Sequence, residues 1–138
     1  MDFLEWFRNA DSAYADIFFA DDAESWLKGA YRITDLPDRY EVLDVTSNPT
    51  MIQTVYGVMD DSTQPTISLQ QYEEAPNILS YNTEELKESN VTVQGENAVC
   101  LTGDTVNVII WPKDGLYFEI SSVLDIDTLV ELANSVRR

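Results

Sequence analysis

Histidine is absent from this 138-residue chain, and cysteine occurs only once. Without histidine, the chain cannot assemble the nitrogen and sulfur ligand sets of ordinary zinc sites. The same absence excludes a Ser-His-Asp triad and a Cys-His pair. A single cysteine also excludes an internal disulfide. Because Cys100 alternates with Ala98 in a strand-like stretch, we expect it to be a small, inert, buried side chain.

Basic residues are also scarce. Eight Lys and Arg stand against 25 Asp and Glu, so the net charge is −17. A surface of that charge repels nucleic-acid phosphates and anionic lipid, and we therefore expect no nucleic-acid partner. The basic residues are scattered along the sequence, and only Arg137 and Arg138 are adjacent. Such acidity is typical of a protein surface that only maintains solubility. It is also typical of a protein that binds a cationic partner such as a basic protein, a basic peptide or Ca²⁺.

Long apolar runs and glycine-rich loops are missing as well. No stretch approaches the roughly 18 apolar residues of a membrane-spanning helix, and residues 1–5 lack the positive start of a signal peptide. We therefore expect that the chain does not itself span a membrane and that any anchor lies outside it. The five glycines stand singly, which excludes a glycine-rich phosphate loop.

What the chain does have is enough apolar material for one core. Hydrophobic residues make up 44% and aromatic residues 11%, and both are spread along the whole sequence. This distribution predicts a single domain over residues 1–138, whose core needs no stabilising metal ion or disulfide. Residues 1–30 are expected to form a helical or extended lead-in, with helical spacing over 3–10.

Alternating and apolar segments over residues 31–138 predict an α+β fold built on a mainly antiparallel, curved sheet. Residues 73–90 are polar and predict a loop with a short helix at 84–88. The other connections between the expected strands are short. Short connections join antiparallel neighbours, because a parallel crossover needs a dozen or more residues. The expected strands are 31–34, 40–46, 52–59, 66–72, 91–93, 98–101, 106–111 and 116–122.

The C-terminal third predicts how the sheet is covered. Strand 106–111 is apolar on both sides, which indicates an interior strand buried on both faces. Asp125 is a good N-cap, and an apolar stripe from Ile126 to Val136 predicts a final helix packed on one face. Arg137 and Arg138 would then lie at its negative C-terminal end. The N-terminal helix or a returning part of the sheet would cover the other face.

Four segments carry a family resemblance. A Leu-Pro-x-x-Tyr segment lies within 31–42, a Val-x-Val-x-Gly hairpin at 91–96, and a Trp-x-x-x-Gly-x-Tyr hairpin within 110–117. A capped Leu-x-x-x-x-Leu-x-x-Leu-Ala-x-Ser helix follows within 124–136. In this order and spacing they resemble the domain of unknown function 4367 over about residues 31–136.

The resemblance implies a location and a kind of parent protein. Members of this family lie at the extracytoplasmic, C-terminal end of single-pass membrane proteins of Gram-positive bacteria, many of them anti-sigma-factor-like. A membrane helix and any cytoplasmic sigma-binding segment would then belong to the full-length protein. The family has no established catalytic residues, so the resemblance assigns none to this chain.

Carboxylates and aromatic residues are the remaining candidates. Three acidic clusters could offer oxygens to Ca²⁺, at 21–24, at Asp60-Asp61 and at Asp125 with Asp127, but none matches an EF-hand loop, and a solvated or structural role is favoured. Residues Asn90-Val91-Thr92 match a glycosylation sequon. Core packing is the favoured role of the aromatic residues, with a ligand groove as the alternative: Trp6, Trp26, Trp111, Tyr14, Tyr31, Tyr40, Tyr56, Tyr72, Tyr81 and Tyr117.

These observations lead to one main hypothesis and two rivals. We expect a non-enzymatic sensing or protein-interaction domain on the outer face of a cell membrane, with a protein or peptide partner, a basic one among the candidates. The first rival is a carrier of a lipid or peptide, and the second is a hydrolase that uses carboxylates alone. No catalytic, cofactor-binding or metal-binding residue is assigned, no cofactor is expected, and the oligomeric state stays open.

Overall fold

The fold is known from a computed structural model that describes residues 30–73 and 86–138. A mainly antiparallel sheet with a C-terminal helix confirms that part of the expected α+β architecture, while the predicted helix at 3–10 lies outside the described residues. The elements are β1 (Arg32–Ile33), β2 (Glu41–Asn48), β3 (Met51–Gly57), β4 (Ile67–Tyr72), β5 (Lys87–Val93), β6 (Glu96–Thr102), β7 (Asn107–Lys113), β8 (Leu116–Ser122), α4 (Ile126–Asn134) and β9 (Val136–Arg137).

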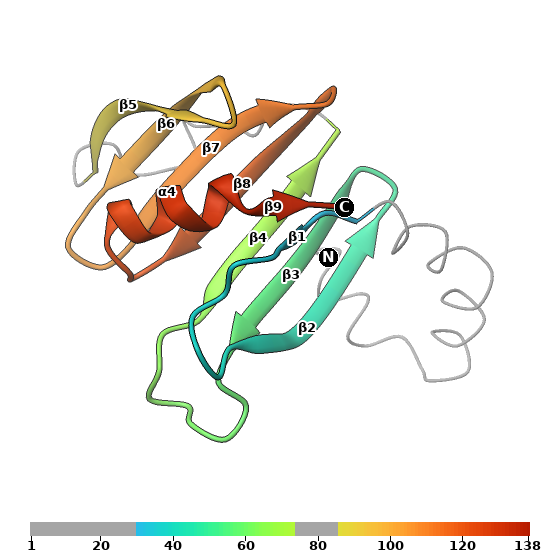
Figure 1. Cartoon of the computed structure of the whole chain (residues 1–138), viewed down its shortest axis with the longest axis vertical. Helices are drawn as coiled ribbons and strands as arrows, with labels where there is room; N and C mark the ends of the chain where they lie inside the picture. Colours follow the sequence, from blue (N-terminus) through green and yellow to red (C-terminus); the bar gives the residue numbers. More distant parts are fainter. Residues whose placement is uncertain (1–29, 74–85) are drawn as a thin grey trace.

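The described residues form two sheets. The large sheet has seven strands in the order β2-β3-β4-β8-β7-β6-β5, and each pair is antiparallel, as the short connections predicted. Strand β4 pairs with β8, so the fourth and eighth strands are neighbours in the middle of the sheet. The short strands β1 and β9 pair with each other and form a two-stranded ribbon, hereafter the ribbon, in front of the large sheet (Figure 1).

Two tight hairpin turns fix the register of the strands under the helix. The β5–β6 turn consists of Gln94 and Gly95, with φ of 51° and 81°, and the β7–β8 turn consists of Asp114 and Gly115, with φ of 54° and 77°. Positive φ at both central residues is the signature of a type I′ turn, whose twist matches that of the flanking strands. Glycine meets the second positive φ at no steric cost.

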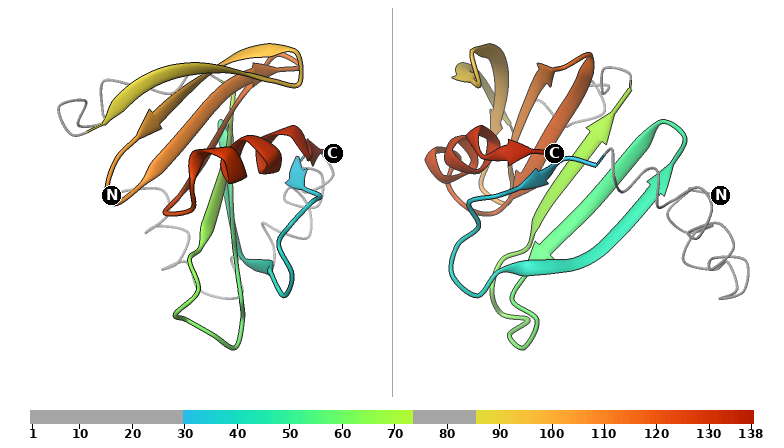
Figure 2. Two further views of the ribbon diagram at one scale, coloured as in Figure 1. Left: turned by 60° about the vertical axis from the view of Figure 1, so that its left-hand side comes forward. Right: turned by 45° about the vertical axis from the view of Figure 1, so that its right-hand side comes forward.

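The main core lies between the large sheet and the elements in front of it. The sheet bends around α4 and the ribbon, and the helix crosses β7 and β8 (Figure 2). Trp111 and Phe118 form the centre of this face, with stacked rings 5.5 Å apart, and Leu129 and Leu132 of α4 pack onto the same cluster. Trp111 and Ile109 thus share a face with Phe118 and Ile120, as the sequence predicted.

A second, smaller cluster lies on the opposite face of the large sheet. Leu101, Val108 and Ile110 are buried there, with Leu86, Val99 and Val106 partly buried around them. Strand β7 is therefore buried on both faces, which confirms the expectation of an interior strand. Burial of large aliphatic side chains contributes about 1.5–3 kcal/mol each relative to leaving them exposed, so this part of the sheet supplies much of the stability.

Side chains of the large sheet hold the ribbon in place. Among the described strands none pairs with the free edge of β1, but the Ile33 backbone N–H donates to the Tyr56 hydroxyl at 3.0 Å. The Tyr31 backbone N–H donates to Oε1 of Gln71 at 2.9 Å. These two contacts satisfy amides that would otherwise be exposed at an edge. The ribbon is thus attached to β3 and β4 through hydrogen bonds as well as through buried Ile33 and Val136.

The end of α4 differs from the prediction. The helix ends at Asn134, and Val136 and Arg137 form β9 instead of a further helical turn. Ser135 marks the change, because its backbone oxygen accepts bonds from the backbone N–H and the hydroxyl of Thr34, at 3.2 and 2.6 Å. Pairing with β1 therefore replaces helix propagation. The expectation that Arg137 and Arg138 lie at the C-terminal end of this helix is wrong, because Arg137 belongs to β9 and the last helical turn holds no basic residue.

The segment before β6 also corrects the prediction. Residues 87–90 belong to β5, where Lys87 lies opposite Thr102 and Asn90 opposite Val99, so a helix does not cover 87–88. The polar residues at 87–90 are typical of a loop because β5 is the edge strand of the sheet, and its first four residues are exposed. Polar and charged side chains on an edge strand also discourage pairing with other chains. Residues 84 and 85 lie outside the described residues.

Candidate functional site

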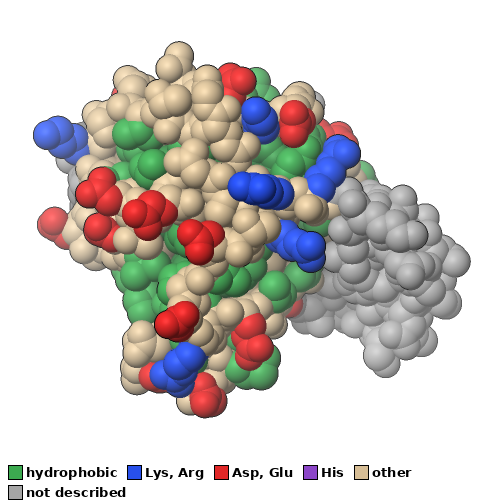
Figure 3. All heavy atoms as spheres, viewed as in Figure 1, with side chains coloured by type: hydrophobic (Ala, Val, Ile, Leu, Met, Phe, Trp, Pro, Cys, Tyr) green, Lys and Arg blue, Asp and Glu red, His purple; other side chains and the backbone are tan. Residues whose placement is uncertain are grey.

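Four cationic side chains that are far apart in the sequence gather around the ribbon. Arg32 and Arg137 lie directly opposite each other in the β1–β9 pair, and Arg138 follows at once. Lys113, at the end of β7, reaches the same region. Figure 3 shows Lys and Arg side chains clustered on the area where Figure 1 places the ribbon, while Asp and Glu are spread over the rest of this face. Half of the eight basic residues of the chain thus share one surface.

This surface contains an open hollow of about 560 Å³. Its lining comes from the ribbon and from the two tight turns, which place Gln94 and Asp114 beside Val136, Arg137 and Arg138. We call the surface the arginine site and define it by Tyr31, Arg32, Gln94, Lys113, Asp114, Arg137 and Arg138.

Tyr31 forms the base of the site. Its ring packs on Phe118 at 4.8 Å, and the Arg138 guanidinium lies over the ring, 5.2 Å from the centroid. The Tyr31 hydroxyl donates to Oδ2 of Asp114 at 2.8 Å. Burial raises the pKa of Tyr31, and the nearby Asp114 carboxylate raises it further. The phenol therefore stays protonated and continues to donate at neutral pH.

Gln94 fastens the turn of β5–β6 to the end of α4. Its side-chain N–H groups donate to the backbone oxygens of Ala133 and Val136, at 2.9 and 3.0 Å. Its backbone N–H donates to Oδ1 of Asn134 at 2.9 Å, and its backbone oxygen accepts from Nζ of Lys113 at 3.4 Å. One side chain thus satisfies a helix-terminal carbonyl and a strand carbonyl together. The arginine site is built on a fixed frame.

The cations of this site have few acidic neighbours. Within residues 30–73 and 86–138, the one salt bridge joins Arg39 to Asp60 at 3.2 Å, in a different part of the molecule. Asp114 lines the hollow as well, but it accepts the hydrogen bond from Tyr31. Among the described residues, Arg32, Arg137 and Arg138 form no salt bridge, and Asp114 is the acidic side chain in the lining of the hollow.

A groove runs from the ribbon toward the edge strand β2. It has a volume of about 300 Å³ and lies between Arg32 and Arg138 on one side and Val42 and Val45 on the other, with Thr54 and Tyr56 also in its lining. Val42 is 47% exposed, although it is apolar. Small-molecule pockets measure roughly 300–1,000 Å³, so this groove is where the carrier alternative would hold a ligand.

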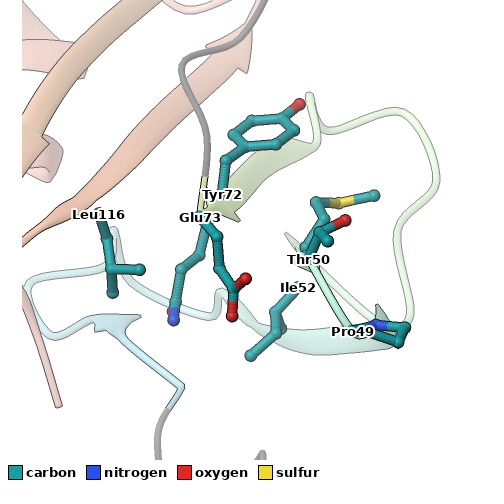
Figure 4. Close-up of a pocket in the computed structure, with 8 residues that line it drawn as sticks. Pro49, Thr50, Ile52, Tyr72, Glu73 and Leu116 are labelled. Carbon is teal, nitrogen blue, oxygen red and sulfur yellow. The ribbon is translucent and has the colours of Figure 1, made fainter.

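A further, smaller hollow lies beside the turn between β2 and β3 and the end of β4 (Figure 4). Its volume is about 180 Å³, below the usual size of ligand pockets. The Glu73 backbone N–H donates to the Thr50 oxygen at 3.0 Å and closes this corner. The lining residues are Pro49, Thr50, Met51, Ile52, Gln71, Tyr72, Glu73 and Leu116.

One carboxylate is buried among the described residues. Glu119 of β8 is 4% exposed, and its Oε2 accepts a hydrogen bond from the Tyr72 hydroxyl at 3.3 Å. Burial raises the pKa of Tyr72, and the charge of Glu119 raises it further. Tyr72 also bonds to the side chain of Gln70 on its own strand. The Tyr72 phenol therefore stays protonated and donates to the Glu119 carboxylate, which makes it a poor general base.

The acidic clusters singled out in the sequence have structural roles where they are described. Asp60 pairs with Arg39, and Asp61 accepts bonds from the backbone N–H of Thr63 and from Gln64, at 3.0 and 3.3 Å. The bonds from Thr63 lower the pKa of Asp61. Asp125 occupies the N-cap position of α4, but its carboxylate bonds to the Thr128 side chain and to no helical amide. Residues 21–24 lie outside the described residues.

The described residues hold neither a cluster of metal ligands nor a membrane-spanning helix. In the described ranges, no group of three or more His, Cys, Asp or Glu side chains is placed to hold a metal ion. Cys100 is fully buried, as expected, and burial raises the pKa of its thiol. Asn90 of the sequon is exposed on β5. Among the helices described, none has the length and apolarity needed to cross a membrane.

The aromatic residues mostly pack, as the sequence favoured. Tyr31, Tyr56 and Trp111 are buried in the main core, and Tyr40 packs against it. Tyr72 and Tyr117 are partly buried. The remaining aromatic candidates lie outside the described residues: Trp6, Trp26, Tyr14 and Tyr81.

The sequence pattern does not predict the arginine site. Its cations looked scattered because Arg32 and Arg137 stand at opposite ends of the described chain, and only strand pairing brings them together. The Asp-Gly dipeptide at 114–115 was a visible turn signal. No local pattern in the sequence predicts that this turn faces the ribbon.

Comparison with known proteins yields one match. No curated protein and no solved structure matches this chain. A family model described as a domain of unknown function (DUF4367) matches residues 30–136, which covers the ribbon except for Arg137, the whole large sheet and α4. The match spans well over half of the 138 residues. The chain therefore belongs to the DUF4367 family.

Proposed function

We propose that this domain is a non-enzymatic recognition domain, held outside the membrane by a membrane-anchored regulatory protein, and that it binds a protein or peptide partner. The observation that carries the proposal is the arginine site. It is an open, preformed hollow with cations available to a partner, and hydrogen bonds from Gln94 and Tyr31 fix its frame. Such a site is suited to binding, because little ordering remains to be done when a partner arrives.

The chemistry of the described residues supports binding over catalysis. A reactive centre of carboxylates would need two of them converging in a water-poor cleft, with at least one strongly perturbed proton affinity. The buried Glu119 instead lies beside a phenol that stays protonated, and Asp114 at the arginine site is engaged by Tyr31. The location outside the membrane is supported by the family resemblance of the sequence.

The binding part of the proposal is tested by site-specific photo-crosslinking of the full-length parent protein in intact cells. A photoreactive residue in place of Arg137 is expected to give one discrete protein adduct. The matched control places the same residue at Lys87, an exposed cationic position on the edge strand β5. No adduct from position 137, or the same adducts from both positions, would contradict the proposal.

The location is tested separately by thiol labelling. Met59 is 67% exposed, whereas the natural Cys100 is fully buried and should not react. A Met59→Cys variant of the parent protein is expected to react in intact cells with a reagent that cannot cross the membrane. Reaction that requires cell lysis would place the domain on the inner side.

A further inference from the structure

We propose that the partner segment at the arginine site is an acidic, extended stretch of polypeptide whose carboxylates pair with Arg32, Arg137 and Arg138. This inference deepens the proposed function and rests on it. Its first support is an unfavourable feature of the free protein. Arg32 and Arg137 lie directly opposite each other on the exposed face of a two-stranded ribbon. Like charges in that relation destabilise a strand pair.

A bound carboxylate would remove that penalty. Between two facing guanidinium groups, one carboxylate can accept hydrogen bonds from both, and charge-assisted bonds of this kind are about twice as strong as neutral ones. The planar guanidinium suits a carboxylate because its N–H groups match the two oxygens. Arg138 is held over the Tyr31 ring at 5.2 Å, so its position is already restricted.

The helix end does not need these cations. Arginines near a helix C-terminus often serve to bond its last carbonyl groups. Here the Gln94 side chain already donates to the Ala133 oxygen, and the Leu132 oxygen accepts from the Ser135 backbone N–H at 3.0 Å. The Asn134 side chain donates to the Val130 oxygen at 3.1 Å. Capping therefore gives no account of three arginines at this place.

The shape and charge of the site favour a peptide over other anions. The hollow is open and continues toward the groove beside Val42 and Val45, since Tyr31 and Arg138 line both. Acidic residues at alternate positions of an extended chain are about 6.6–6.8 Å apart, which allows one to meet the arginine pair while the next meets Arg138. An anionic membrane is disfavoured, because its wide surface would also face the acidic remainder of the protein, whereas a short segment contacts the arginine site alone.

The groove beside β2 can also accept apolar side chains that lie between the carboxylates of the peptide. Val42 is 47% exposed and Val45 is partly buried, both in the lining of the groove. A segment that alternates Glu with Val would present its acids to the arginines and its methyl groups to this groove. The arginine site thus fits a short acidic strand with interleaved apolar residues.

The test is an NMR titration of the ¹⁵N-labelled protein with the capped pentapeptide Glu-Val-Glu-Val-Glu at low ionic strength. We expect shifts at the side-chain N–H signals of Arg32, Arg137 and Arg138, and a Kd that weakens about tenfold, or 1.4 kcal/mol, in an Arg137→Gln variant. A Lys87→Gln variant removes one cationic charge far from the site and should bind within about twofold of the wild type. Added salt should weaken binding, because the contacts are exposed.

Three outcomes would overturn the assignment. The peptide could fail to shift these signals, it could bind equally to the Arg137→Gln variant, or the Gln-Val-Gln-Val-Gln peptide could bind as well as the acidic one. Inorganic phosphate and phosphatidylglycerol vesicles serve as competing probes, and preferential binding of either through the same arginines would also reject the peptide. A crosslink from position 137 in cells would still support a recognition domain, so failure of the acidic chemistry is distinguishable from failure of the proposed function.

Discussion

The half of the large sheet under α4 and the half beside the ribbon are built in different ways. Strands β7 and β8 are packed on both faces, with Trp111 and Phe118 almost inaccessible to solvent. On the other side, the edge strand β2 exposes Val42 and Leu43 and carries a register irregularity between Val42 and Asp44. The ribbon there is held by backbone N–H groups that donate to the side chains of Tyr56 and Gln71. One half therefore supplies stability, while the other leaves groups free for recognition.

The largest difference should appear when apolar side chains are truncated in each half. Phe118→Ala removes a fully buried ring that contacts Trp111 and Tyr31, and it should cost about 3–5 kcal/mol in the free energy of unfolding. Val42→Ala, at a half-exposed position, should change that free energy by no more than about 0.5 kcal/mol. Urea denaturation measures both. Similar losses for the two variants would contradict the division into halves.

A smaller effect is expected from the attachment of the ribbon. Tyr56→Phe leaves the buried backbone N–H of Ile33 without its acceptor, at a cost of about 1–3 kcal/mol. Tyr40→Phe serves as a control, because its hydroxyl donates to the Pro65 oxygen in a partly exposed position, where water can replace it. Tyr56→Phe should also speed hydrogen exchange at the Ile33 amide. Unchanged exchange there would show that the ribbon is held by packing alone.

The boundary between the two halves should respond to high pH through Tyr72 of β4, which contacts Glu119 of β8. Burial and Glu119 raise the pKa of Tyr72 in the folded protein, so the unfolded chain loses the phenol proton first, near its ordinary pKa of about 10. The stabilisation from this group is thus complete below about pH 10 and is lost as the pH rises further. Stability measured against pH should fall less steeply above pH 10 in Tyr72→Phe than in the wild type. Parallel curves would contradict the assigned cause.

The smallest effect is a gain in stability at the arginine site. Arg137→Thr removes the like charge opposite Arg32 and should raise the free energy of unfolding by about 0.2–1 kcal/mol at low salt. The gain should shrink as salt screens the two exposed charges. A stability that falls at every salt concentration would mean that Arg137 stabilises the ribbon, and the argument from the unfavourable pair would fail.

The sequence predicted the packed half better than the ribbon half. Alternating residues and turn glycines such as Gly115 specify a hairpin locally, and they located β7, β8 and α4 with errors of a few residues. Pairing between β1 and β9 depends on residues from opposite ends of the described chain, which no local pattern encodes. For this reason the sequence predicts a helix through Val136, although Val136 pairs with Ile33 in the structure.

The candidate site was less predictable than the fold, for two physical reasons. A cationic surface made of Arg32, Lys113 and Arg137 is a property of the tertiary structure, and the overall charge of −17 conceals it. The family match ends at residue 136, so two of the arginines lie beyond what family membership describes. The sequence suggested a basic partner from the total charge, whereas the local charge at this site favours an acidic one.

Native-state hydrogen exchange with and without the acidic pentapeptide tests the central claim most directly. Binding at the ribbon should slow exchange at amides of β1 and β9, such as those of Arg32 and Val136, and should leave the doubly buried strand β7 unchanged. Protection that is uniform, absent, or centred on β5 and β6 would contradict the account of a stable half and a recognition half.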